Sequence, residues 1–155
     1  MTLTTPPERQ PEAIPQPGSF SILVADDDRG NRDTLAGLLR DRGFDTHVAA
    51  DGTEAVQIVQ VRMIHLVLID MHMPRLTGLE AVQMVRQLNA LLPAILMTAD
   101  ATRELMRQAF QAQVYSVIPK PVNVNVVLQT LQRALQQVYG PPAKPATDPT
   151  NPPKE

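Results

Sequence analysis

The sequence predicts an α/β fold, a five-stranded, doubly wound parallel sheet flanked by five helices. Five short β-rich runs alternate with five helical patterns over the 120 residues from 20 to 139. Parallel strands require crossover connections, and these are right-handed, so the alternation favours one sheet with helices on both faces. The chain has 155 residues, 43% of them hydrophobic and 19% charged, which is the size and composition of one globular domain.

The first half of this region supplies two strands and two helices. The run SILVADD (21–27) is apolar until its final acids and is expected to be a buried strand. Leucines at helical spacing predict a helix over 31–42, and Gly43 is expected to end it. The second strand, FDTHVAA (44–50), is followed by a helix in DGTEAVQIVQV (51–61).

The second half supplies three more strands and three more helices. The strands are expected at IHLVLID (64–70), AILMTA (94–99) and YSVIPK (115–120). Apolar residues recurring every three or four positions predict helices over 77–92, 101–112 and 123–139.

Proline marks the ends of the predicted domain. Of 15 prolines, five lie in residues 6–17 and six in 141–153. These segments have almost no large apolar residues, so they cannot offset the entropy of ordering a chain. We therefore expect disordered Pro-rich tails at 1–19 and 140–155 around one domain at 20–139.

Composition excludes several classes of function. The formal net charge is −2 without a cluster of Lys and Arg, so we expect no nucleic acid and no anionic membrane as a partner. No apolar stretch reaches the roughly 18 residues of a membrane span, and the N-terminus does not resemble a signal peptide. The chain has no Cys, which excludes disulfides and thiolate metal sites. A cytoplasmic location is the default expectation.

Polar side chains follow four of the five predicted strands. In a doubly wound sheet these carboxyl ends meet at one edge, where ligands bind near the reversal of strand order. Several carboxylates gathered there repel one another unless a cation joins them, and Mg²⁺ suits oxygen ligands of this kind. The pattern predicts a Mg²⁺ and phosphate site with one nucleophilic carboxylate. The residues at the strand ends are Asp26, Asp27, Asp28, Asp70, Thr98 and Lys120.

Lys120 is the one lysine between residues 20 and 139, where ten arginines supply every other cation. A compact ammonium group on a flexible stem reaches a phosphoryl oxygen more readily than a guanidinium group does. The use of lysine rather than arginine at this position supports a phosphate-binding role for Lys120.

Five stretches, in this order and spacing, resemble the receiver domain of bacterial two-component response regulators: ILVADDD, DGTEAV, LVLIDMHMPRLTGLE, ILMTA and IPKPV. The resemblance covers residues 20–139 and implies the flavodoxin-like receiver fold. It also implies that Asp70 is the phosphoacceptor. Mg²⁺ would be the cofactor, bound by Asp26, Asp27, Asp70 and the backbone carbonyl of His72.

The resemblance implies two further contacts to the phosphoryl group. Thr98 would bind it as the switch hydroxyl, and Lys120 would form an ion pair with it. The peptide bond between Lys120 and Pro121 would be cis, which aims the lysine. Asp28 is expected to be a helix N-cap rather than a metal ligand.

The function implied is that of a stand-alone response regulator in a phosphorelay. Only about 16 residues follow the last helix, so we expect no output domain. The donor would be a sensor histidine kinase or a histidine phosphotransfer protein, and a downstream protein of unknown identity would read the changed surface. The protein would be a monomer or a homodimer. We expect no enzyme in the usual sense, but a phosphoacceptor with self-catalysed phosphotransfer and autodephosphorylation.

The sequence departs from the family on the fifth strand. An aromatic switch residue is usual three positions before the lysine, and here that position is Val117, with Tyr115 two residues earlier. The output surface must then change by another means than the inward swing of an aromatic ring.

Two other functions stay open at this point. The missing aromatic residue would suit an interaction module of receiver fold that is never phosphorylated. A Mg²⁺-dependent hydrolase with an aspartyl-phosphate intermediate would usually carry a second Asp two residues after the nucleophile, where this chain has His72.

Overall fold

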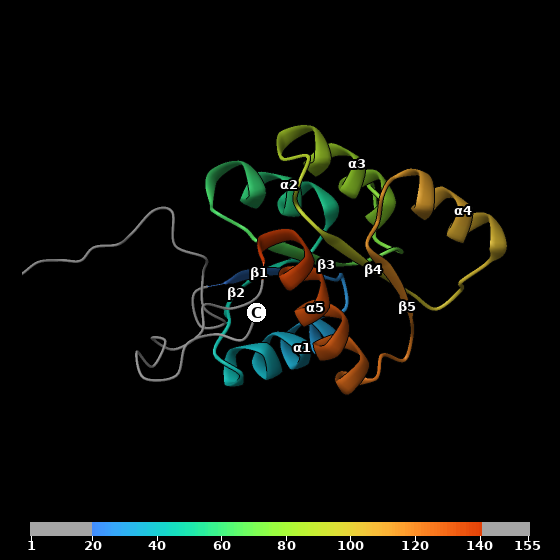
Figure 1. Ribbon diagram of the computed structural model, residues 1–155. Helices are drawn as coiled ribbons and strands as arrows, with labels where there is room; N and C mark the ends of the chain where they lie inside the picture. The colour runs from blue at the N-terminus through green and yellow to red at the C-terminus, as the bar shows by residue number, and fades with distance from the viewer. Residues whose placement is uncertain (1–19, 141–155) are drawn as a thin grey trace, which may run out of the picture.

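The computed structural model describes residues 20–140. The predicted Pro-rich tails, 1–19 and 140–155, lie outside the described residues apart from Gly140. The described part of the chain forms five strands and five helices in strict alternation (Figure 1). The strands are β1 (Ser21–Ala25), β2 (Asp45–Ala49), β3 (Leu66–Asp70), β4 (Ala94–Thr98) and β5 (Ser116–Pro119). The helices are α1 (Arg29–Asp41), α2 (Gly52–Val61), α3 (Gly78–Leu88), α4 (Arg103–Gln111) and α5 (Val124–Tyr139).

All five strands pair in parallel in the order β2-β1-β3-β4-β5, which confirms the predicted fold class. The chain first adds β2 on one side of β1 and then β3 on the other, so the strand order reverses between β1 and β3. This reversal is the place where doubly wound sheets form ligand crevices.

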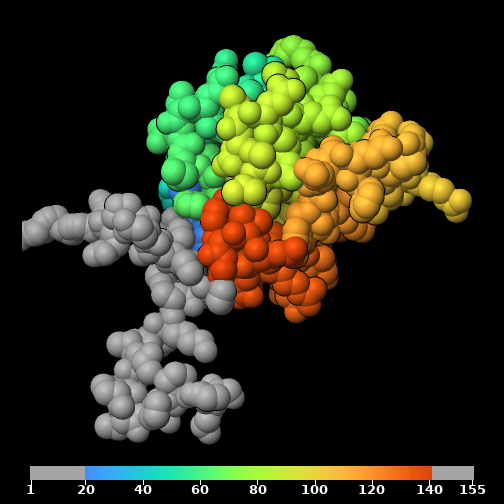
Figure 2. Space-filling model, turned by 45° about the horizontal axis from the view of Figure 1, so that its top comes forward, coloured from blue at the N-terminus to red at the C-terminus, as the bar shows by residue number. Residues whose placement is uncertain are grey.

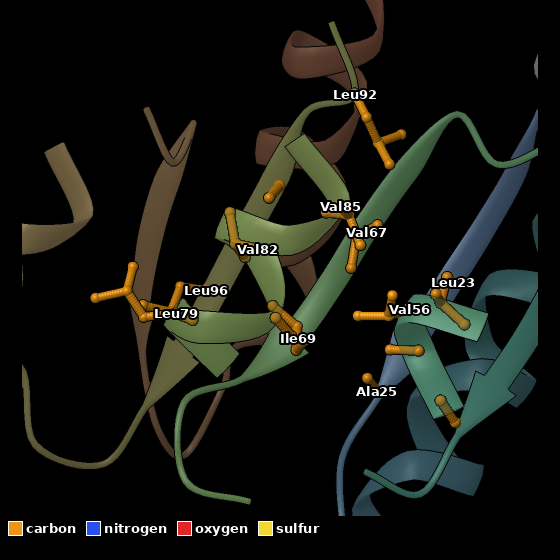
Figure 3. Close-up of a cluster of buried hydrophobic side chains, with 14 of the residues drawn as sticks. Leu23, Ala25, Val56, Val67, Ile69, Leu79, Val82, Val85, Leu92 and Leu96 are labelled. Atoms are coloured by element: carbon orange, nitrogen blue, oxygen red, sulfur yellow. The ribbon is translucent and has the colours of Figure 1, made fainter. Parts of the chain in front are cut away.

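Alternate strand residues face two helical layers. Figure 1 shows α1 and α5 on one face of the sheet and α2, α3 and α4 on the other. Side chains at even positions of β1, such as Ile22 and Val24, pack with Leu39 and Leu131 from the first layer. The opposite cluster joins strand side chains to α2 and α3, as Figure 3 shows for Ile69, Val56 and Val82. Burial on both faces explains why the central strands β1, β3 and β4 are apolar runs without polar alternation, whereas the edge strands β2 and β5 are less buried.

Every helix begins at a side chain that accepts a backbone N–H from its first turn, which satisfies a donor that the helix itself leaves unpaired. Asp28 is such a cap, as the sequence predicted, and accepts from the amide of Asn31. Thr77 and Glu80 form a reciprocal capping box at the start of α3. The five N-caps are Asp28, Asp51, Thr77, Thr102 and Asn123.

Several predicted elements were longer than the observed ones, among them α3 and β1. The helix expected over 77–92 ends at Leu88, because Asn89 is extended and its side chain accepts the amide of Leu91. The strand expected over 21–27 ends at Ala25. The acids Asp26 and Asp27 therefore lie in the loop after β1.

A cluster of three rings closes the end of the sheet away from these acids. His65 makes edge-on contacts with Phe20 and Tyr139, with ring centroids 5.2 Å apart in each case. Its Nδ1 accepts the amide of Ser21 at 2.9 Å, and the Tyr139 hydroxyl donates to its carbonyl oxygen at 2.8 Å. Burial lowers the pKa of His65 and raises the pKa of Tyr139 to about 12. The neutral imidazole therefore joins the start of β1 to the end of α5.

We expect His65→Leu to lower the free energy of unfolding by about 1–2 kcal/mol, because the Ser21 amide loses its acceptor. His65→Asn, whose side-chain oxygen can accept the same amide, should retain part of that stability. The folded state disfavours imidazolium, so the stabilisation is complete above the unfolded pKa near 6.5 and is lost as pH falls through the folded pKa. Urea unfolding at pH 7.5 and pH 5.5 measures both effects. An equal pH dependence in wild type and His65→Leu would contradict this account.

Candidate functional site

Three carboxylates meet at the carboxyl edge of the sheet, where the strand order reverses. In the β1–β3 register Ala25 lies opposite Ile69, so the next residues, Asp26 and Asp70, are brought side by side. Asp26 is 2% exposed and Asp70 is 4% exposed, whereas Asp27 is open to solvent. One oxygen from each of these three acids lies within 4.8 Å of the others.

Lys120 lies between the two buried acids. Its Nζ is 3.2 Å from Asp26 Oδ2 and 3.2 Å from Asp70 Oδ1. The lysine follows β5, where its amide donates to the carbonyl of Thr98, and the Lys120–Pro121 peptide bond is cis. The remaining oxygen of Asp26 accepts the amide of Asp28 at 2.9 Å. Through its amide and its ammonium group, Lys120 thereby connects the end of β4 to the loop after β1.

The charges in this site act against one another. Burial and the neighbouring Asp26 raise the pKa of Asp70, and the contact with Lys120 only partly offsets this. Burial works to lower the pKa of Lys120, but the two carboxylates outweigh it and the pKa is raised. One ammonium group thus faces a cluster of three acids with two buried members. A set of hard carboxylate oxygens with excess negative charge fits a divalent cation such as Mg²⁺.

Gly78 shapes the loop that follows Asp70. A Cβ at this position would lie 2.3 Å from the carbonyl oxygen of Asp70, so no other residue fits without moving the backbone. The Gly78 amide donates to the carbonyl of Met71 at 2.8 Å and closes the loop. Arg75, in the left-handed region with φ 69°, pairs with the N-cap Asp51 at 2.7 Å. The loop is therefore fixed at its base and at its far side.

Thr98 ends β4 with its side chain fully buried. Its hydroxyl accepts the amide of Asp100 at 3.1 Å and lies 3.4 Å from Nε2 of His72. Sequence reasoning considered only the backbone carbonyl of His72, and its contribution to a metal site stays a prediction. The imidazole contact was missed because no spacing rule connects a loop residue to the end of a strand 26 residues later.

The site opens into a cavity of about 490 Å³ with Asp26 and Lys120 in its wall. Leu35 and Leu38 of α1 and Val122, which precedes α5, also line it. A group that enters this cavity can reach the ammonium of Lys120 without crossing the hydrophobic core.

Comparisons with known proteins identify the class. The family model "Response regulator receiver domain" matches residues 22–132. The sensor histidine kinase RcsC of Escherichia coli K12 is 34% identical over 127 residues, which are 82% of this chain and 13% of that protein. The transcriptional regulatory protein ZraR of Salmonella typhimurium is 31% identical over 118 residues, 76% of this chain and 27% of that protein.

Solved structures agree with this assignment. A CheY-like receiver domain protein from Methanospirillum hungatei aligns with a TM-score of 0.74 and 25% identity, covering 76% of this chain and 94% of that one. The chemotaxis protein CheY4 of Vibrio cholerae aligns with a TM-score of 0.71 and 29% identity, covering 74% and 98% of the two chains.

The fold is that of a receiver domain. The chain belongs to the response regulator receiver domain family. The resemblance stated from its motifs is thus confirmed. The chain spans only 13% and 27% of the lengths of RcsC and ZraR, so its stand-alone status stays a prediction. No helix within residues 20–140 combines the length and apolarity needed to cross a bilayer.

Asp70→Asn should stabilise the metal-free protein at pH 7 by about 1 kcal/mol, because it removes a buried charge while Lys120 keeps Asp26 as its partner. A carboxyl group with a raised folded pKa destabilises the fold when ionised, so the advantage should shrink as pH falls through the folded pKa toward 3.8. Thermal melts without divalent ions check this, with the exposed Asp27→Asn as matched control. A lower melting temperature for Asp70→Asn than for wild type at pH 7 would contradict it.

Proposed function

We propose that this receiver domain accepts a phosphoryl group on Asp70 from a histidine kinase or a histidine phosphotransfer protein. One observation carries the proposal. The carboxylate of Asp70, at the end of a rigid buried strand, is held 3.2 Å from Lys120 and shares a potential metal site with Asp26 and Asp27. A nucleophile fixed by a strand and flanked by cation-binding groups suits phosphoryl transfer, where positioning and charge neutralisation supply most of the catalysis.

Mg²⁺ would be held by Asp26, Asp27 and Asp70, with the backbone carbonyl of His72 as the remaining protein ligand. When bound, it supplies positive charge that offsets the phosphoryl oxygens and the excess charge of the acids. Asp26 is placed for this by two contacts, the Asp28 amide and Lys120. Asp27 is exposed and can turn toward the ion at little cost.

In the transfer step a carboxylate oxygen of Asp70 forms a bond to phosphorus as the phosphorus–nitrogen bond of the donor phosphohistidine breaks. The electron pair of that bond stays on the imidazole nitrogen, which leaves as neutral histidine once it gains a proton. Lys120 can move from the carboxylates to a phosphoryl oxygen, since its ammonium already contacts Asp70. Autodephosphorylation is the attack of water on the same phosphorus, which returns the Asp70 carboxylate and releases phosphate.

The family relationship supports the proposed donor. RcsC, one of the relatives, is named as a sensor histidine kinase, which is the class of donor that we propose. We further propose that the protein works in the cytoplasm as a stand-alone regulator, as a monomer or a homodimer, and signals to a downstream protein.

Incubation with acetyl phosphate and Mg²⁺, followed by intact-mass spectrometry, should add one phosphoryl group to wild type. Asp70→Asn, which keeps the shape but loses the anionic nucleophile, should gain none. Asp28→Asn is the matched control, because Asn is an equally good N-cap and Asp28 lies two residues from Asp26. It should be phosphorylated at a rate within about twofold of wild type.

Each outcome separates the candidate functions. A stable single adduct on Asp70 supports the receiver, and the absence of any adduct in wild type would favour the unphosphorylated interaction module. Multiple turnovers of acetyl phosphate without accumulation would favour the hydrolase. A comparable adduct on Asp70→Asn would overturn the assignment of Asp70.

We propose that the signal leaves through residues 98–103 and the start of α4. The position of the usual aromatic switch is Val117, which packs against the core on the α4 side. In α4, only Leu105 and Ala109 are buried, while Phe110 is 83% exposed. Figures 1 and 2 place α4, in gold, at an edge of the molecule. A helix with so little burial can shift at low cost when Thr98 moves.

Addition of beryllium fluoride and Mg²⁺ should shift the amide NMR signals of residues 98–103 in wild type. Thr98→Ala should still bind the analogue at Asp70, because the acids and Lys120 remain, but the response of these amides should fall at least about twofold. Amide nitrogen chemical shifts, compared at saturation, measure this. If the amide signals of these residues do not shift in wild type, or shift equally in Thr98→Ala, the signal does not leave through residues 98–103.

A further inference from the structure

The hydrogen bonds of the Thr98 hydroxyl are almost fully used in this structure. A threonine hydroxyl has one proton to donate and two lone pairs to accept with. Thr98 Oγ1 accepts the amide of Asp100 at 3.1 Å and lies 3.4 Å from Nε2 of His72. The group is shielded from water, since Thr98 is 0% exposed. Whether His72 donates to this oxygen or accepts its proton therefore decides which hydrogen bond the hydroxyl can still form.

In either tautomer of His72, the contact with Nε2 uses part of the hydrogen-bonding capacity of the Thr98 hydroxyl. With Nε2 as acceptor, His72 takes the single proton of Thr98. With Nε2 as donor, His72 fills the second lone pair, and the Thr98 hydroxyl is held by two donors. With Nε2 as donor the Thr98 proton stays free for another acceptor, so Thr98 must give up its contact with His72 to donate elsewhere only when Nε2 is the acceptor. At 3.4 Å the contact is long and weak, which suits a bond that is to be exchanged.

The backbone under His72 is held rigidly, whereas its ring is free to leave. The loop is closed by the hydrogen bond from Gly78 to Met71 and by the ion pair of Arg75 with Asp51. The His72 amide faces Asp70 Oδ1 at 3.4 Å. The residue itself is exposed, so the imidazole can swing into solvent without loss of buried contacts. A fixed base and an exposed ring are the properties of a releasable latch.

We propose that the imidazole of His72 is a positioning group that latches the Thr98 hydroxyl while Asp70 carries no phosphoryl group. The proposal rests on the proposed function and on the expected role of Thr98 as the hydroxyl that donates to a phosphoryl oxygen. With Nε2 of His72 as acceptor, the phosphoryl group and His72 compete for the one proton of that hydroxyl. The latch biases the domain toward its resting state and lowers the apparent affinity for the phosphorylated arrangement by the strength of one hydrogen bond.

The test is a calorimetric titration of the full chain with beryllium fluoride in saturating Mg²⁺. His72→Leu removes the ring nitrogen and keeps the backbone carbonyl, and it should bind about threefold to tenfold more tightly than wild type. His72→Gln is the rescue variant, because its side-chain amide can reach the position of Nε2, and it should bind within about twofold of wild type. Thr98→Val removes the hydroxyl with little change of shape. On the Thr98→Val background, His72→Leu should have no effect, because the contact is already gone.

The outcomes distinguish failure of the His72 latch from failure of the proposed function. Wild-type binding that His72→Leu leaves unchanged or weakens overturns the latch and leaves the phosphoacceptor assignment standing. A gain from His72→Leu that persists on the Thr98→Val background also overturns it, since the side chain then acts through the metal or the loop. Failure of wild type to bind beryllium fluoride, or equal binding by Asp70→Asn, overturns the proposed function and the latch together.

Discussion

The repulsion between the buried carboxylates of Asp26 and Asp70 is the constraint around which this domain is arranged. The register of β1 and β3 forces the two acids together, and burial on both faces of the sheet removes the water that would screen them. Lys120 satisfies both, but it comes from the far end of the chain, after the fifth strand. The site is therefore complete only when the fifth strand has joined the sheet, and its excess negative charge favours a cation in the finished fold.

The order of the strands places these two carboxylates in a crevice that a ligand can enter. Because the strand order reverses between β1 and β3, no helix connection covers the point where Asp26 and Asp70 meet. Thr98 and Lys120 reach the same edge from β4 and β5 through a register that advances along the sheet, with Asp70 opposite Met97 and Thr98 opposite Pro119. The sheet holds the carboxylate of Asp70 rigidly, whereas Lys120, which contacts it, lies in a loop after β5.

The sequence predicted these features because they depend on residue type and period. Apolar runs define the strands, and an acid or a lysine after such a run must lie at the shared edge, so Asp26, Asp70 and Lys120 could be found without coordinates. Contacts between loops carry no such pattern. The imidazole of His72 beside Thr98, the missing Cβ of Gly78 against Asp70 and the ring cluster at His65 all depend on the path of the backbone. The end of α3 at Leu88 was missed because Leu91 and Leu92 continue the apolar pattern after the helix has stopped.

The two loops beside Asp70 differ in how firmly they are held, and the proposed switch depends on this difference. The loop from Met71 to Thr77 is fixed by a steric contact at Gly78, an ion pair to α2 and a capping box. The segment after β4 depends on the Thr98 hydroxyl, whose amide contact to Asp100 and long contact to His72 are both exchangeable, and it leads into a helix with two buried residues. In the proposed switch, phosphorylation of Asp70 changes the charge beside both loops, and the more weakly held second loop responds. The rigid loop would then provide the reference against which the Thr98 segment moves.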